Sequence, residues 1–483
     1  MNYYLNPKLL LPLVSLAFAA GCTSRSGQNN DSGNDQSPNI IYIMADDLGY
    51  GDIEPYGQRM IKTPNLDQMA RDGIMFTQHY AGNTVCAPSR CSLITGLHPG
   101  NAYVRGNKQA EPSGQLPLPR ETVTVSGLLQ EAGYQTGMIG KWGLGNLGNS
   151  GDPKWHGWDF YYGYLDQVLA HNYYPEFLIR NGEKEYLRNE VIYLSDTLWH
   201  KGLGSYSVDK IDYSHDLFTE EALRFIDRNK DDPFFLYLPY TIPHNNGEAP
   251  AGEKQEVPDF GKYKKEREWK RDTKGYAAMI SRMDRDIGRI MERVDSLGLG
   301  EKTLVIFTSD NGPMPNTPFT DRFDSNGPMK GGKRDFYEGG IRVPFIARWT
   351  GTIEPGSVSE HISAFWDFLP TVCDLAGIPR PENTDGISYL PELLGKKQEK
   401  HEYLYWESPL NGFMTAIRKG RWKAVKENYR EKPDAEFELY DLTEDIGEEN
   451  NVAEKHPDIV EEMEAIARKA HSPSHHFPMP SEQ

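Results

Sequence analysis

Two apolar stretches, far apart in the sequence, each end in a pair of oxygen-bearing side chains. Residues 39–45 are followed by Asp46 and Asp47, and residues 303–309 are followed by Asp310 and Asn311. Such runs predict buried strands, and sites in open α/β sheets form at the carboxyl ends of strands. Either pair alone is more often structural, as a helix cap or a turn. Their recurrence favours a hard-oxygen metal site, with Ca²⁺ the preferred ion and Mg²⁺ the competitor.

A third candidate is Cys86, which opens the stretch Cys-Ala-Pro-Ser-Arg. Pro88 can occupy the first turn of a helix over residues 89–95, so position 86 would face a helix N-terminus, where partial positive charge favours anions. Arg90 adds a planar cation suited to sulfate or phosphate. From residue chemistry alone, a buried structural cysteine before a helix is an equally good interpretation.

The elements that must position these residues alternate along the chain. Apolar periodicity predicts helices over residues 66–73, 122–133, 216–229 and 276–297, and further strands over 135–139 and 233–238. This alternation predicts a largely parallel α/β sheet. After about residue 349 the pattern changes to antiparallel strands over 416–425 and 437–441, flanked by helices over 365–376 and 458–470. We therefore expect a catalytic domain over residues 39–350 and a smaller C-terminal α+β domain over 351–483.

Bulk composition excludes some functions. The 483 residues carry a formal net charge of −18, and no Lys/Arg-dense stretch of the kind that binds nucleic acid is present in the sequence. The four cysteines are Cys22, Cys86, Cys91 and Cys373, too few for a disulfide framework. Whether Cys91 and Cys373 pair is left open by the sequence.

The N-terminus predicts export. Lys8 precedes an apolar run over residues 9–20, too short to span a membrane comfortably, which ends in small residues before Cys22. The cysteine after Gly21 resembles a lipobox, although Ala19 stands where that motif usually has Leu. We expect a signal peptide over residues 1–21, lipidation of Cys22, and a flexible tether over 22–38. The protein would be a bacterial lipoprotein, periplasmic or anchored at the outer membrane; an ordinary secretory signal is the alternative.

The stretch at residues 86–90, followed by Leu-Ile-Thr-Gly at 93–96, closely resembles the motif of type I sulfatases. The resemblance covers nearly the whole chain after residue 38. Its further motifs lie, in order, at residues 46–47, 63–67, 140–142, 243–244, 310–312, 332–333, 337–340 and 439–442. It implies an alkaline-phosphatase-like fold, with a large mixed sheet flanked by helices and a C-terminal antiparallel sheet. The branch it resembles is that of bacterial carbohydrate sulfatases.

The resemblance also implies a mechanism. In this family a maturase oxidises the motif cysteine, here Cys86, to Cα-formylglycine. One hydroxyl of the hydrated aldehyde would attack sulfur, the alcohol would leave, and the other hydroxyl would eject sulfate. Calcium would be bound by residue 86 and the four strand-end residues Asp46, Asp47, Asp310 and Asn311. Four further residues would act on the diol or the sulfate: Arg90 and Lys141 orient the diol, Lys333 and His244 contact sulfate, and His244 is the likelier proton donor.

One position departs from the family pattern. Gly143 stands where the family has a histidine that assists collapse of the sulfated intermediate. His171 is our candidate for a replacement base, although it could instead bind sugar or pack. Gly143 together with the Gln-x-x-Ala-His stretch that begins at Gln167 resembles enzymes acting on galactose-configured sugars, and O4 is the expected position. Arg105 and Asn107 could also reach the sugar, but a structural loop role is at least as good.

Two other functions compete with exo-acting hydrolysis of a sulfated glycan. A phosphoester or phosphonate hydrolase of the same superfamily would share the fold, but related phosphatases present Ser or Thr and bind two zinc ions, whose second ligand set is not evident in the sequence. The other is a catalytically silent, glycan-binding lipoprotein. The presence of the complete Cys86 motif and of the metal ligands argues against both.

Overall fold

The computed structural model describes residues 37–110, 115–194, 204–432 and 435–482. The signal peptide, Cys22 and nearly all of the tether lie outside the described residues. Residues 37–483 form one compact unit, and the domain boundary near residue 350 stays a prediction. Among the helices of the described ranges, none is long and apolar enough to cross a membrane.

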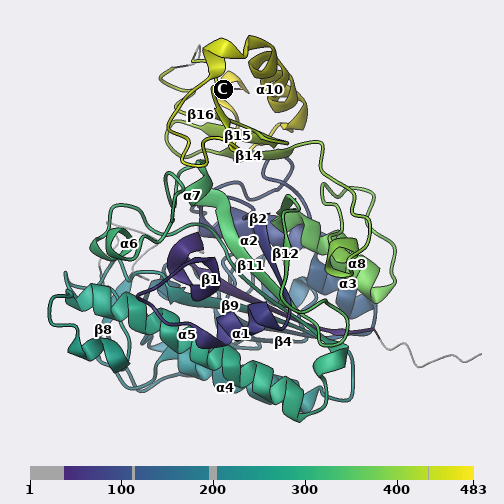
Figure 1. Ribbon diagram of the computed structural model, residues 1–483. Coiled ribbons are helices and arrows are strands. Elements are labelled where there is room, and N and C mark those ends of the chain that lie inside the picture. Colours follow the sequence, from purple (N-terminus) through teal and green to yellow (C-terminus); the bar gives the residue numbers. More distant parts are fainter. Residues whose placement is uncertain (1–36, 111–114, 195–203, 433–434, 483) are drawn as a thin grey trace, which may run out of the picture. The chain divides into compact units, whose positions relative to one another are not determined.

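A large mixed sheet forms the centre of this unit (Figure 1). In spatial order its strands are β12 (Ser357–Ser359), β2 (Ile74–Tyr80), β11 (Arg342–Arg348), β10 (Thr303–Ser309), β1 (Asn39–Asp46), β9 (Phe234–Pro243), β3 (Gln135–Lys141), β4 (Phe160–Tyr164), β5 (Phe177–Arg180) and β6 (Glu183–Tyr186), with β13 (Ser363–Ala364) also paired to β2. The five strands from β10 to β4 are parallel to one another, whereas β11 and β5 are antiparallel to their neighbours. The predicted parallel centre and mixed sheet are confirmed.

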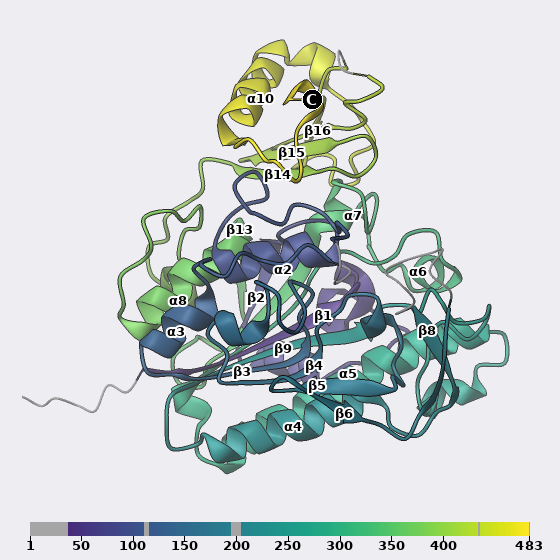
Figure 2. The ribbon, with the colours of Figure 1, turned by 180° about the vertical axis from the view of Figure 1, so that it is seen from behind.

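Helices cover both faces of the sheet (Figures 1 and 2). On one face lie α1 (Pro64–Arg71), α4 (Ser214–Arg228) and α5 (Arg271–Ser296), and on the other lie α2 (Cys86–Thr95), α3 (Val125–Glu131) and α8 (Phe368–Ala376). The shorter helices are α6 (Pro318–Phe323), α7 (Glu338–Ile341) and α9 (Leu390–Leu393). A separate hairpin joins β7 (Glu190–Tyr193) to β8 (Ser205–Asp209).

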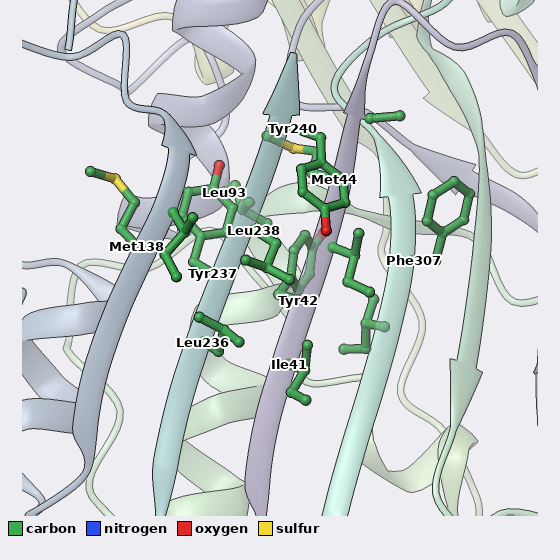
Figure 3. Packing of buried hydrophobic residues seen from close by; sticks show 14 of the residues in the cluster. Ile41, Tyr42, Met44, Leu93, Met138, Leu236, Tyr237, Leu238, Tyr240 and Phe307 are labelled. Atoms are coloured by element: carbon green, nitrogen blue, oxygen red, sulfur yellow. The ribbon is translucent and has the colours of Figure 1, made fainter. Parts of the chain in front are cut away.

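The central strands are mostly apolar because both of their faces are covered. Every residue of β1, β9 and β10 is buried, as parallel sheets between helix layers require. Figure 3 shows the side chains of Tyr42 and Tyr237 on adjacent strands, and the ring of Tyr42 packs 4.5 Å from that of Phe368 in α8. This packing fixes the strands firmly, and with them the residues at their ends.

The C-terminal part carries a second, antiparallel sheet, as predicted. Its strands are β14 (Leu404–Ser408), β15 (Met414–Lys419), β16 (Trp422–Lys426) and β17 (Glu438–Asp441), and α10 (Pro457–Ala470) packs on it (Figure 1). Alternate residues face opposite ways: Tyr405 joins a cluster with Met463 of α10, whereas Trp406 joins one with Tyr80 of β2. The second sheet is therefore packed against the large one through its other face.

Candidate active site

Four predicted site residues lie at the carboxyl ends of adjacent parallel strands. Asp46 ends β1, Lys141 ends β3, His244 directly follows β9, and Asp310 directly follows β10. The Asp310 N–H donates to the carbonyl oxygen of Ala45 at 3.0 Å, which holds two of these ends together. The sheet thus gathers residues from distant parts of the sequence at one edge, as the strand-end argument predicted.

Buried ion pairs organise this edge. The Lys141 Nζ lies 2.8 Å from Asp46 Oδ2, and the Lys333 Nζ lies 2.8 Å from Asp47 Oδ2. The Arg90 guanidinium donates to Asp310 Oδ2 from Nε at 3.2 Å and from Nη2 at 2.8 Å. Three cations thus face three carboxylates, which offsets the large desolvation cost of burying each charge.

Burial and neighbouring charges shift the pKa values of Asp46 and Asp310 in opposite directions. Burial alone would raise the pKa of Asp46, but Lys141, His244 and Arg90 hold it well below its usual value. Burial and the negative charge of Asp46 raise the pKa of Asp310 to about 6, against the opposing effect of Arg90. A cation bound beside Asp310 would favour its ionised form.

Cys86 begins α2 and lies beside these pairs. Its Sγ donates to Asp46 Oδ1 at 3.4 Å and lies 3.7 Å from the Lys333 Nζ. Burial, followed by the negative charge of Asp46, raises the pKa of the thiol to about 12. An unmodified Cys86 would be protonated at neutral pH and a weak nucleophile, because the thiolate is the reactive form.

The residues present fit a hard divalent cation. Asp46, Asp47, Cys86 and His244 each offer a ligand atom within 4.8 Å of the others. The Asn311 amide donates from Nδ2 to Asp47 Oδ1 at 2.8 Å, which leaves its buried Oδ1 without a hydrogen-bond partner in the described residues. Buried polar atoms are seldom left unpaired. A cation held by the carboxylates and this amide oxygen would satisfy it.

His244 and His171 form a stacked pair above this group. Their ring centroids are 4.6 Å apart, and His171 Nδ1 lies 3.0 Å from Glu248 Oε2. His244 Nε2 lies 3.5 Å from Asp47 Oδ2. Burial, followed by the positive charge of Lys333, holds the pKa of His244 well below its usual value. Without a bound anion His244 is therefore neutral and can still donate one ring N–H.

Gln167 fills the space beside Gly143. Gly143 has a φ of +77°, and a β-carbon there would come within 3.2 Å of the Gln167 Cδ. The Gln167 amide donates to Asn107 Oδ1 at 3.5 Å. A left-handed backbone and this close neighbour both favour glycine at position 143. The sequence pattern singled out Gln167 only as part of a family-like stretch and did not predict this contact.

A cavity of 460 Å³ opens onto these groups. Its lining includes Cys86, His171, His244 and Lys333 from the predicted site and the predicted sugar candidate Asn107, together with Gly143, Gln167, Lys108, Glu248 and Arg334. This size is typical of small-ligand pockets. Of the residues that sequence reasoning missed, Glu248 lies in a loop with no recognisable pattern, and Arg334 is adjacent to the predicted Lys333.

Arg105 does not line this cavity. Its guanidinium donates to Glu407 Oε1 at 2.7 Å and to the carbonyl oxygens of Ala102 and Ser472. It therefore connects the loop after α2 to β14 and to the segment after α10. The structure thus does not bring Arg105 to the sugar pocket, and it supports the alternative structural role.

Comparisons with known proteins agree with this geometry. The family model described as "Sulfatase" matches residues 38–378, and that described as "N-sulphoglucosamine sulphohydrolase, C-terminal" matches residues 331–471. The chain belongs to the sulfatase family. This sulfatase is therefore a sulfuric ester hydrolase, and its family implies a formylglycine and a divalent metal.

Several relatives resemble this sulfatase over most of its length. It is 31% identical to an N-acetylgalactosamine-6-O-sulfatase of Bacteroides thetaiotaomicron, over 95% of this chain and 98% of that one. A solved sulfatase structure connected with glycosaminoglycan metabolism by the same organism has a TM-score of 0.74 at 28% identity, covering 90% of this chain and 99% of that one. The structure of i-CgsB in complex with k-i-k-neocarrahexaose also has a TM-score of 0.74 at 28% identity, covering 92% and 94%. These relatives support hydrolysis of carbohydrate sulfate esters.

Proposed function

We propose that this sulfatase removes one sulfate ester from the end of a glycan, at a galactose- or N-acetylgalactosamine-configured sugar. Cys86 would act as formylglycine, and Ca²⁺ would be held by Asp46, Asp47, Asp310 and Asn311 with residue 86. One observation carries the proposal: Cys86 lines a 460 Å³ cavity beside Lys333 and His244. A cavity of this size can hold a small ligand such as a terminal sugar.

Formylglycine supplies an oxygen nucleophile for sulfur, and a bound cation supplies positive charge that favours the ionised nucleophile. Lys333 faces both residue 86 and Asp47, so its ammonium can contact a sulfate held over residue 86. His244 lines the same cavity; once a bound sulfate anion favours its protonated form, the imidazolium can donate a proton to the leaving sugar oxygen. Arg90 and Lys141 keep Asp310 and Asp46 ionised and in place.

Two observations support the galactose configuration. The first is the N-acetylgalactosamine in the name of a relative that is 31% identical over almost the full length. The second is the combination of Gly143 with Gln167 and His171, which line the cavity together and resemble a galactose-acting branch. That resemblance favours an ester at O4, whereas the relative is named for position 6, so both positions belong in the test.

We also propose that the protein is exported and anchored through lipidated Cys22, and that a host maturase converts Cys86. The supporting observations are the apolar run and small residues before Cys22 and the Cys-Ala-Pro-Ser-Arg stretch itself. Export would place the enzyme in the periplasm or at the outer membrane, in contact with sulfated glycans.

The test is sulfate release from a panel of saccharides that each carry one sulfate and differ in the sugar and in the position of that sulfate. The panel contains galactose and N-acetylgalactosamine esters at O3, O4 and O6, with glucosamine and fucose esters as controls. The enzyme is co-expressed with a formylglycine-generating enzyme, and conversion of residue 86 is checked by peptide mass. Release from one galactose-configured ester, absent in Cys86→Ala, supports the proposal.

Other outcomes separate the competing functions. Release only from glucosamine or fucose esters would contradict the sugar configuration and keep the reaction class. If converted enzyme releases nothing, phosphonates and phosphodiesters are tried next, and turnover of those would favour the superfamily alternative. Glycan binding without turnover of any substrate would favour the silent binder.

A further inference from the structure

The cavity carries more positive charge than the proposed reaction uses. Among the described residues its lining includes three permanent cations, Lys108, Lys333 and Arg334, but only one acid, Glu248, which is paired with His171. This excess stands in a chain whose formal net charge is −18. Lys333 has a role at the sulfate that is cleaved, whereas Lys108 and Arg334 have none.

Arg334 is held in a backbone conformation that is unusual for its type. Its φ is +80°, in a region that residues with a β-carbon rarely adopt. Its N–H donates to the carbonyl oxygen of Thr84 at 3.1 Å, and its own carbonyl accepts from Asn411 Nδ2 at 3.4 Å. Strained positions of this kind persist where the surrounding structure enforces them, and they cluster at ligand sites.

The guanidinium of Arg334 is free to bind a ligand. It forms no hydrogen bond or ion pair with any residue in the described part of the chain, whereas Arg90 and Arg105 each face a carboxylate. The Lys108 Nζ donates to the carbonyl oxygen of His476 at 2.8 Å and lies 5.6 Å from the centre of the Phe477 ring. Both partners are uncharged, so the positive charge of Lys108 is not neutralised.

We propose that Arg334 and Lys108 form a second anion-binding subsite, an inference that rests on the function proposed above. Arg334 directly follows Lys333, so their Cα atoms are about 3.8 Å apart. Lys333, Arg334 and Lys108 also line one cavity, so a glycan whose scissile sulfate is bound by Lys333 can present a neighbouring substituent to Arg334 and Lys108. The preferred substrate carries a second anionic group, a sulfate or a carboxylate, on the same sugar or on the next one. Arginine suits both groups because its planar fork binds two oxygens at once.

The experiment compares three substrates built on the ester that the panel identifies. The first carries only the scissile sulfate on a neutral disaccharide, the second adds another sulfate to that sugar, and the third replaces the neighbouring sugar with a uronic acid. Fully converted wild-type enzyme is compared with Arg334→Gln, Lys108→Gln and Arg334→Lys. Arg267→Gln is the control. It removes the same charge, but Arg267 is exposed and does not line the cavity.

We expect wild type to prefer a substrate with a second anion about tenfold in kcat/KM at low salt, as one charge-assisted hydrogen bond allows. Arg334→Gln should reduce this preference to about twofold or less through KM, Lys108→Gln should weaken it, and Arg334→Lys should retain part of it. High salt should lower the wild-type preference because the subsite is exposed. Arg267→Gln should behave as wild type. Preference for the second substrate or the third identifies the anion as sulfate or carboxylate.

Equal kcat/KM for all three substrates in wild type, or an undiminished preference in Arg334→Gln, would overturn the inference while the proposed function stands. If wild type with confirmed formylglycine hydrolyses none of the three, the proposed function fails and the inference fails with it. The thermal midpoint of Arg334→Gln is measured alongside to detect a folding defect. If Arg334→Gln is misfolded, the result with Arg334→Lys decides.

Discussion

The imidazole rings of His171 and His244 stack with their centroids 4.6 Å apart and their planes inclined by 18°. His244 follows a central strand, whereas His171 ends a short 3₁₀ helix, Leu169–His171. Glu248 lies 3.0 Å from His171 Nδ1 and orients its ring. A carboxylate that orients a histidine in this way resembles the arrangement that prepares a general base. His171 therefore stays our candidate for the histidine that is missing at Gly143.

We expect His171→Ala to lower kcat by roughly a hundredfold or more, the usual contribution of a general base. If His171 assists collapse of the sulfated intermediate, residue 86 should accumulate with sulfate attached, which peptide mass detects. Glu248→Gln should show the same defect in milder form because the ring keeps its place but loses the carboxylate. A higher KM with no trapped sulfate would show that His171 contacts the sugar instead.

Cys86→Ala tests the nucleophile. Its side chain is only 2% exposed, and alanine removes one sulfur atom without adding charge, so the fold should be retained. We expect sulfate release to fall roughly a thousandfold or more, since a covalent nucleophile has no substitute. Unconverted wild type, made without a maturase, should be equally inactive because burial and Asp46 raise the thiol pKa to about 12. Full activity in unconverted enzyme, confirmed by peptide mass, would refute the formylglycine proposal.

Calcium should stabilise the protein as well as activate it. Asp46, Asp47 and Asp310 repel one another, and a cation relieves that repulsion only in the folded state. At a Ca²⁺ concentration of about 100 Kd the gain is about 2.7 kcal/mol, visible as a rise in the thermal midpoint. We expect EDTA to reverse it and Asp47→Asn to remove most of it, whereas Asp231→Asn, at an exposed carboxylate, should not. A Ca²⁺ shift that survives in Asp47→Asn would argue against this site.

The part of the site that the sequence predicted is the part that rigid strands position. Asp46 ends one fully buried strand and Asp310 follows another, and the sequence shows each strand as an apolar run. The strand β10 has the same bounds, residues 303–309, as the predicted run. Because adjacent parallel strands end at one edge, the convergence of these residues follows from the pattern alone. The edge strand β6 lacks that pattern because its residues are mostly polar and exposed, and it was missed.

Contacts between segments distant in sequence account for what the sequence could not predict. Arg105 was a candidate sugar ligand, but its guanidinium forms an ion pair with Glu407. No local sequence pattern predicts a partner that lies in another sheet. Glu248 and Arg334 belong to loops whose paths depend on the packing of the whole unit. Loops follow no periodicity, so their residues enter a pocket without a signal in the sequence.

Gly143→Ala and Gly148→Ala form a matched pair. Both glycines have left-handed backbones, with φ of +77° and +79°, but a β-carbon meets Gln167 at position 143 and nothing within 4 Å at position 148. Each variant should lose about 1–2 kcal/mol of unfolding free energy from backbone strain. Only Gly143→Ala should also raise KM, because the Gln167 amide that lines the cavity must move. An equal change in KM for the two variants would contradict a role for the Gln167 position.

His471 should make stability depend on pH. Its Nδ1 lies 2.7 Å from Glu407 Oε2 and its Nε2 lies 3.1 Å from Glu482 Oε1, so both nitrogens face carboxylates. Burial alone would lower the pKa of His471, but these two acids raise it above its usual value. The folded state therefore binds the proton more tightly than the unfolded state does. The resulting stability is fully present below the unfolded-state pKa of about 6.5 and is lost as pH rises through the folded-state pKa.

The measurement is the difference in thermal midpoint between wild type and His471→Gln, which cannot carry the proton. We expect this difference to be largest below the unfolded-state pKa of about 6.5 and to shrink as pH rises through the folded-state pKa of His471. His475→Gln, at an exposed neighbouring histidine, is the control and should follow wild type across the range. A difference that grows with pH would mean that neutral His471, not its cation, stabilises the link between Glu407 and Glu482.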